Sequence, residues 1–170
     1  MMIDSGQAQA KIVVREVSTP QEMEHVFQIR DEVFVHEQAL THDARFDPDD
    51  RRSIHFLAYL DGKPVGTGRL TVLTREAQVA WVAVRKPYRQ HGVGKAVMIA
   101  ILERARDEEA DYVVLNAQSH ALEFYRRLGF ETLGHEFRMA GIPHQVMVLG
   151  LTTQGRDDAR TLFSRNSFGI

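Results

Sequence analysis

Apolar positions along this chain switch between a strand-like and a helix-like period, and each switch marks an expected element. Lys11 to Val17 is short and β-branched, which is typical of a strand. Thr19-Pro20-Gln21-Glu22 has the form of a capping box with proline at the first helical position, so we expect a helix to begin there. Its apolar face is formed by Met23, Val26, Phe27, Val33 and Phe34. His36 to Asp50 is polar and aperiodic, and predicts a loop or a broken second helix.

The next stretch has the pattern of an antiparallel meander. Ile54 to Leu60 and Val65 to Leu73 are apolar runs joined by Asp61-Gly62, a pair that favours a tight hairpin. Gln78 to Arg85 predicts a further strand, which should stop before Pro87 because proline cannot donate a ladder hydrogen bond. Three consecutive antiparallel strands are therefore expected.

Helical and strand patterns alternate in the second half. The helix expected from Gly92 to Arg106 is apolar nearly all round, which predicts that it is sandwiched between other elements. Gly129 is placed to end a later helix in a left-handed cap. The later expected elements are a strand over Tyr112 to Ala117, a helix over Ser119 to Leu128, and strands over Phe130 to Phe137 and Gln145 to Leu151. The order β-α-β-β-β-α-β-α-β-β predicts an α+β fold, a mixed sheet covered by helices.

The length of 170 residues fits one domain with a hydrophobic core. We expect that domain over residues 11–151, after a loose N-terminal arm at 1–10 and before a C-terminal tail at 152–170. The tail is mostly polar with scattered apolar residues, so we expect either a flexible segment or an arm that docks on a partner subunit. A homodimer is the expected assembly.

Composition narrows the functional classes. The absence of cysteine excludes disulfides, thiolate zinc sites and a cysteine nucleophile, and favours the reducing cytoplasm. A formal charge of -2 gives no overall cationic field, so neither nucleic acid nor an anionic membrane is an expected partner. No stretch approaches the roughly 20 apolar residues that span a bilayer. No metal site is expected, because His42, Asp43, Asp47, Asp49 and Asp50 lack a known ligand spacing and predict a solvated acidic rim.

The segment Arg89-Gln90-His91-Gly92-Val93-Gly94-Lys95 lies between an expected strand and an expected helix. Its two glycines allow a bulky anion to approach the backbone, and the first N–H groups of the helix then point at that anion. The spacing fails the mononucleotide P-loop, because Ala96 follows where serine or threonine is needed. It also fails the dinucleotide fingerprint, because Val97 occupies the third glycine position. The expected occupant is a phosphate or pyrophosphate of another kind of ligand.

Two signatures resemble those of the GNAT acetyltransferase family. The pattern Val82-Ala83-Val84-x-x-x-Tyr88-Arg89-x-x-Gly92-x-Gly94 is similar to the family's acetyl-CoA motif, and Phe124-Tyr125-x-x-x-Gly129-Phe130 is similar to its second signature. Within the family, Arg30-x-x-Val33-Phe34-Val35-x-Glu37-Gln38 and Gly141-Ile142-x-His144 resemble the ElaA-like and YjcF-like branch. The resemblance covers roughly residues 12–151. It implies a GNAT fold with a mostly antiparallel sheet that is splayed at an acetyl-CoA site.

The resemblance also implies which residues hold the coenzyme. Backbone N–H groups of Arg89, Gln90, His91, Gly92, Val93, Gly94 and Lys95 are expected to hold the pyrophosphate. Val82 and Val84 are expected to pair with pantetheine as an added strand would, and the Val84 N–H is expected to polarise the thioester carbonyl. Gln118 stands where many members of the family have asparagine, and is assigned to the coenzyme site.

Tyr125 is the expected general acid. Amine attack on the thioester releases a thiolate, and a phenol within reach of the sulfur can protonate it. Glu37 is the first candidate for binding or deprotonating the amine, because it follows the first helix, where this fold builds its acceptor pocket. His55, His120 and His144 are the other candidates for the general base.

The expected function is direct acetyl transfer from acetyl-CoA, as cosubstrate, to a primary amine of a small molecule or peptide. A related alternative is an acyl-homoserine-lactone synthase, whose first helix also carries an arginine and a Val-Phe pair, but the intact loop and the chain length argue against it. A third hypothesis is an acyl-CoA-binding sensor or assembly module without turnover.

Overall fold

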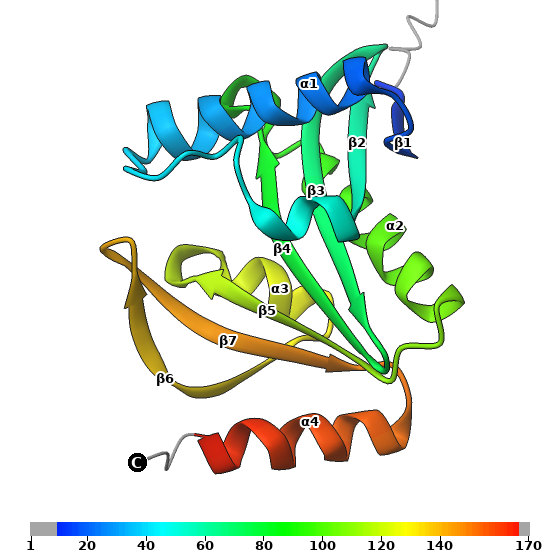
Figure 1. Cartoon of the computed structure of the whole chain (residues 1–170), viewed down its shortest axis with the longest axis vertical. Helices are drawn as coiled ribbons and strands as arrows, with labels where there is room; N and C mark the ends of the chain where they lie inside the picture. Colours follow the sequence, from blue (N-terminus) through cyan, green and yellow to red (C-terminus); the bar gives the residue numbers. More distant parts are fainter. Residues whose placement is uncertain (1–9, 167–170) are drawn as a thin grey trace, which may run out of the picture.

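The computed structural model describes residues 10–166, in which a seven-stranded sheet carries helices on both faces (Figure 1). The strands are β1 (Ile12–Glu16), β2 (Ile54–Leu60), β3 (Lys63–Leu73), β4 (Glu76–Val84), β5 (Tyr112–Gln118), β6 (Glu131–Met139) and β7 (Ile142–Gly150). The helices are α1 (Pro20–Arg30), α2 (Val93–Asp107), α3 (Leu122–Arg127) and α4 (Thr153–Asn166), with a π-helix η1 (Asp31–Glu37) and 3-10 helices η2 (Pro48–Arg52), η3 (Lys86–Tyr88) and η4 (Ser119–Ala121).

The sheet order is β1-β2-β3-β4-β5-β7-β6, and every neighbouring pair is antiparallel except β4 and β5. The crossover between the two parallel strands contains α2. The α+β fold with a mixed, mostly antiparallel sheet is therefore confirmed.

Local sequence signals account for several element ends. The Thr19 hydroxyl accepts the Glu22 N–H at 3.1 Å, so the predicted capping box begins α1. Asp61 and Gly62 have φ angles of 49° and 83°, the left-handed values that a tight hairpin turn requires. Gly129 has a φ of 100° and ends the helical segment that contains α3, as predicted.

The core has a separate cluster on each face of the sheet. Phe56 and Ala58 of β2 pack with α2 and α3, whereas Leu57 packs with α1 on the opposite face. The prediction that α2 is sandwiched was wrong, because Ile99 of α2 is 43% exposed and the helix has one solvent-facing side. Gly68 of β3 lets α2 approach closely, since a Cβ there would lie 2.8 Å from side chains of α2.

The segment after residue 151 folds against this chain's own sheet. Helix α4 runs along β7 (Figure 1), and its buried Ala159 joins the cluster of Tyr112, Val114 and Val148. Gly155 permits the contact, because a Cβ at that position would collide with the Asp111 carbonyl. We had expected a flexible tail or an arm on a partner subunit. The expected N-terminal arm lies almost wholly outside the described residues.

Two segments after α1 also differ in form from the expectation. The helix continues without a break into η1, where Gln38 donates its N–H to the Val33 carbonyl five residues back at 3.1 Å. Within the expected loop, η2 is capped by Asp47, whose side chain accepts the Asp49 N–H at 2.9 Å. None of the helices in residues 10–166 has the length and hydrophobicity needed to span a bilayer.

Candidate active site

The sheet opens between β4 and β5. Their parallel pairing runs from Glu76 and Tyr112 only as far as Val79 and Leu115, although both strands continue beyond it. In Figure 1 the two strands meet near one end and diverge toward the other. A bulge in β4 lies at this point and places Trp81 and Val82 between the residues that pair with Thr67 and Arg69 of β3. The opening leaves strand edges available to a ligand.

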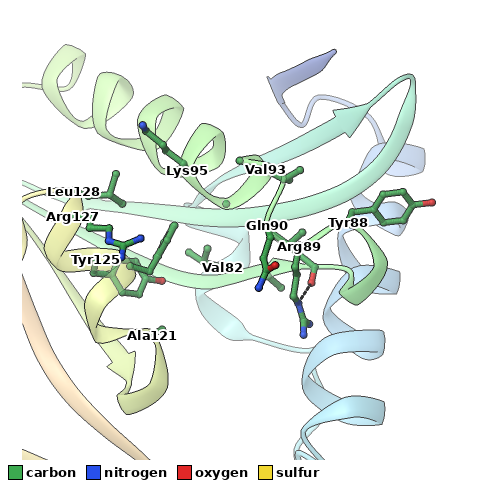
Figure 2. A pocket seen from close by; sticks show the side chains of 15 residues that line it. Val82, Tyr88, Arg89, Gln90, Val93, Lys95, Ala121, Tyr125, Arg127 and Leu128 are labelled. Carbon is green, nitrogen blue, oxygen red and sulfur yellow. Dashed lines mark hydrogen bonds between the residues drawn. The ribbon is translucent and has the colours of Figure 1, made fainter. Parts of the chain in front are cut away.

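The backbone of Val84 faces this opening. The next residue, Arg85, donates its N–H to Val65 of β3 at 2.9 Å, and successive residues of a strand direct their N–H groups to opposite edges. The Val84 carbonyl accepts a hydrogen bond from Arg89 Nε at 2.8 Å, drawn as a dashed line in Figure 2. The Val84 N–H is left directed into the opening.

An anion site lies beside the opening, at the start of α2. Gly92 is the N-cap with a φ of 85°, and the first bond within the helix is donated by Ala96 to the Gly92 carbonyl at 3.0 Å. The N–H groups that precede Ala96 therefore have no carbonyl of their own helix to bind. Gly94 keeps the approach open, because its added Cβ would lie 3.4 Å from the Phe124 ring. The arrangement can hold a phosphate group.

A cavity of about 790 Å³ joins the anion site to the opening (Figure 2). It is lined by Val82, Ala83, Val84, Tyr88, Arg89, Gln90, Gly92, Val93, Gly94, Lys95, Ala121, Phe124, Tyr125, Arg127 and Leu128. The cavity thus brings together nine of the twelve site residues expected from the sequence. His91, Glu37 and Gln118 do not line it. Phe124, Arg127 and Leu128 also line it, although none of them is among the site residues expected from the sequence.

Tyr125 projects from α3 into this cavity (Figure 2). The residue is 8% exposed, and its ring packs edge-on against Phe124 and Phe130 at centroid distances of 4.9 and 5.8 Å. Burial raises the pKa of the Tyr125 phenol to about 12, so the hydroxyl carries its proton at neutral pH. Within residues 10–166 no group forms a hydrogen bond with this hydroxyl. It is therefore free to donate to a bound ligand.

The Arg89 side chain turns away from the anion site. Its guanidinium forms two hydrogen bonds with the Glu37 carboxylate, at 2.6 and 2.7 Å. Hydrogen bonds from Arg89 hold the pKa of Glu37 below its ordinary value, and desolvation opposes them. Glu37 is therefore a carboxylate at neutral pH and a weak proton acceptor. Cationic charge on the cavity wall comes instead from Lys95 and Arg127.

Gln118 forms hydrogen bonds with Gln38, the residue that follows η1. The side-chain amides of Gln38 and Gln118 exchange two hydrogen bonds, at 3.2 and 2.8 Å. Glu37 and Gln38 are consecutive, and they reach Arg89 after β4 and Gln118 at the end of β5. Together they span the open end of the sheet.

The three histidine candidates have different surroundings. His55 is 8% exposed and donates Nε2 to the Asp50 carbonyl at 2.9 Å, and burial lowers its pKa. His144, which pairs with Gln118 in the β5–β7 register, donates Nδ1 to the Ile142 carbonyl at 2.7 Å. In the neutral His144 ring, Nε2 is then the proton acceptor. His120 lies on η4.

The predicted acidic rim was wrong for Asp47 and Asp50. Asp50 is 12% exposed at its side chain and pairs with the buried Arg30 at 2.8 Å, and Asp47 pairs with Arg69 at 2.8 Å. No local pattern indicates this burial, because the arginine partners come from α1 and β3. Within the described range, His, Asp and Glu side chains do not gather in groups of three that could hold a metal ion.

Comparison with known proteins relates this geometry to a family. The family model described as an acetyltransferase (GNAT) domain matches residues 13–151. The uncharacterized N-acetyltransferase YjcF of Bacillus subtilis is 36% identical over 129 residues, covering 75% of this chain and 92% of YjcF.

Solved structures agree in fold. Escherichia coli ElaA superposes with a TM-score of 0.72 at 24% identity, covering 82% of this chain and 98% of ElaA. An acyl-CoA N-acyltransferase from Pseudomonas aeruginosa superposes with a TM-score of 0.69 at 25% identity, covering 82% of this chain and 98% of that protein.

Proposed function

Since the chain belongs to the GNAT acetyltransferase family, with YjcF among its relatives, and is an acyltransferase, we propose that it transfers an acetyl group from acetyl-CoA to a primary amine. The observation that carries the proposal is the continuous cavity from the N-terminus of α2 to the opening beside Val84 and Tyr125. Such a path suits a ligand with phosphates at one end and a thioester at the other. The acceptor amine belongs to a small molecule or peptide.

The coenzyme's pyrophosphate would lie against the N–H groups that begin α2, with Gly92 and Gly94 allowing its approach. The amides of pantetheine would pair with the free edge of β4 at Val82 and Val84, as a short added strand. The Val84 N–H would then donate to the thioester oxygen, where negative charge develops during attack. This placement uses the Val84 N–H and the first N–H groups of α2, whereas the Val84 carbonyl already accepts a hydrogen bond from Arg89.

The transfer needs no covalent enzyme intermediate. The neutral amine forms a C–N bond with the thioester carbon, the C–S bond breaks, and the amine nitrogen releases one proton. We propose Tyr125 as the general acid. Its protonated hydroxyl faces the cavity and can protonate the departing thiolate. Solvent returns a proton to the phenolate.

Glu37 is proposed to lie at the acceptor side of the opening. Its lowered pKa favours attraction of a cationic amine over proton removal. His144 and His120 stay candidates for the general base, His144 because its Nε2 can accept a proton. A cytoplasmic location and a homodimer stay predictions from the sequence.

A free-thiol assay tests the proposal. The protein is mixed with acetyl-CoA and a panel of primary amines, and release of coenzyme thiol is followed together with the mass of the acetylated product. Because the chain has no cysteine, all thiol signal comes from the coenzyme. Amine-dependent thiol release that is lost in Gly94→Val would support the proposal. Tight acetyl-CoA binding without thiol release for any amine would instead indicate a sensor.

A further inference from the structure

The bulge of β4 contains a bulky residue in an uncommon backbone conformation. Trp81 has a φ of 55°, in the left-handed region that side chains larger than glycine or asparagine rarely adopt. Such a conformation persists only where the surroundings hold it. Trp81 immediately precedes Val82, where β4 begins to line the cavity. Whatever holds Trp81 therefore also sets the direction of the strand edge at the opening.

Three side chains fix the Trp81 indole. Its Nε1 donates to Asp47 Oδ2 at 2.9 Å. The Arg30 guanidinium lies over the ring at 4.9 Å from the centroid, and Phe34 packs edge-on at 5.1 Å. Asp47 is the only one of these that fixes the indole by a directional hydrogen bond, so it determines the rotation of the ring as well as its depth.

Asp47 is itself held rigidly. One of its carboxylate oxygens caps η2 through the Asp49 N–H at 2.9 Å, while the other accepts from Trp81 and pairs with Arg69 at 2.8 Å. Arg69 also pairs with Asp50 at 3.0 Å, and Asp50 forms two hydrogen bonds with Arg30 at 2.8 and 3.2 Å. We call these four residues, Arg30, Asp47, Asp50 and Arg69, the buried ion network. It ties η2, which contacts β3 (Figure 1), to the indole.

We propose that Asp47 is a positioning residue for the coenzyme, acting through Trp81. It holds the bulge so that Val82 and Val84 present their backbone groups to the opening. The inference rests on the proposed use of that opening by acetyl-CoA. It differs from the expectation of an acidic rim, because Asp47 acts on the strand behind the coenzyme and contacts no substrate.

The test is the variant Trp81→Phe, which keeps an aromatic ring and removes the N–H donor. We expect the Kd for acetyl-CoA, measured by calorimetry, to rise about threefold to thirtyfold, because a hydrogen bond to a charged acceptor is lost. The matched control is Thr71→Val, which removes the 2.6 Å contact with Ser53 beside the same loop without touching Trp81. It should lower the melting temperature and leave the Kd within about twofold.

A second measurement keeps this inference separate from the proposed function. In the protein without coenzyme, amide exchange and chemical shifts of Val82 and Val84 should change in Trp81→Phe and in Asp47→Leu, and should not change in Thr71→Val. If wild-type protein does not bind acetyl-CoA, the proposed function fails, and the amide data alone decide the positioning role. Unchanged amides at both valines, or an unchanged Kd in a wild-type protein that binds, would overturn it.

Discussion

Two polar clusters flank the half of β4 that separates from β5, and they differ mainly in burial. The buried ion network lies at the bulge, where Arg30 is fully buried and Arg69 is 7% exposed. At the end of the strand, Arg89 and Glu37 pair at 2.6 Å with side chains that are 35% and 33% exposed. In the first cluster, loss of one partner leaves a charge that water cannot reach, whereas in the second, water replaces the partner. We therefore expect the network to support the fold and the exposed pair to affect mainly the chemistry.

The largest expected effect is on stability, from Asp50→Ala. The change removes the carboxylate shared by Arg30 and Arg69, and breaking a buried pair costs about 3–5 kcal/mol. Urea unfolding measures the loss of free energy. Arg52→Ala is the matched control, because it removes a surface pair with Asp49 and should cost less than about 1 kcal/mol. Equal losses in the two variants would remove the contrast between buried and exposed charge.

Gly94→Val should show the opposite pattern, with binding lost and the fold retained. A Cβ at Gly94 meets only ordinary contacts with Phe124 and Val84, so the backbone tolerates it, but branched methyl groups would extend into the cavity. We expect the Kd for acetyl-CoA to rise about a hundredfold, because the charged pyrophosphate would lose hydrogen bonds that contribute about 1.5–3 kcal/mol each. The Kd of Gly94→Ala should lie between the Kd of Gly94→Val and that of the wild type. Calorimetry with unchanged affinity in folded Gly94→Val would mean that the coenzyme binds elsewhere.

Tyr125→Phe should lower kcat with little effect on either stability or coenzyme affinity. General acids contribute about 10²–10⁴-fold, and a thiolate is already a fair leaving group, so we expect a loss of about tenfold to a hundredfold. The ring contacts with Phe124 and Phe130 persist in the variant. Tyr59→Phe, on β2, is the control. A wild-type kcat in Tyr125→Phe would assign this residue to packing alone.

The pH dependence gives an independent test of the same residue. Because the pKa of Tyr125 is raised to about 12, its acid form persists throughout the stable pH range. Between about pH 8 and 10, titration of the Tyr125 phenol should therefore not lower the wild-type kcat. Any fall in kcat over this range should also be seen in Tyr125→Phe. A basic limb near pH 10 that disappears in the variant would show that the phenol titrates near its ordinary value.

Glu37→Gln should have the smallest effect on stability, below about 1 kcal/mol, because the pair is a third exposed. If the carboxylate attracts a cationic amine, the acceptor KM should rise about twofold to fivefold, whereas a base role would lower kcat instead. Glu32→Gln is the matched control on the same π-helix, because the Glu32 side chain is 49% exposed and does not line the cavity. A loss of stability in Glu37→Gln as large as that in Asp50→Ala would contradict the contrast between the buried ion network and the exposed pair.

The sequence predicted elements where the signal is local. The Thr19 capping box, the Asp61-Gly62 turn and Gly129 each specify a backbone geometry within a few residues, and all three were confirmed. The loop from Arg89 to Lys95 likewise combines two glycines with a helix start, so six of the fifteen residues of the cavity wall could be named in advance.

Features that depend on distant partners could not be predicted in this way. Asp50 is buried by arginines that lie 20 and 19 residues away in the chain, and no periodicity records such a pairing. Helix α4 has a mostly polar sequence, and its docking depends on the small residues Gly155 and Ala159 fitting closely against the sheet. Glu37 and Arg89 are 52 residues apart in the chain. A role could be predicted for each residue from the sequence, but their pairing, which lowers the pKa of Glu37, could not.

The bulge at Trp81 also changes the parity of β4. Before it, Ala77 and Val79 pack toward α2, and after it Val82 and Val84 do, so the strand switches from odd to even positions. Deletion of Trp81 would remove the extra residue, so that Val82 would lie opposite Gly68 in a regular ladder and both valines would keep the face toward α2. The strand would then lose its bend and keep its pattern of faces. A one-residue deletion in a regular part of β4 would instead turn every later residue of the strand to the opposite face.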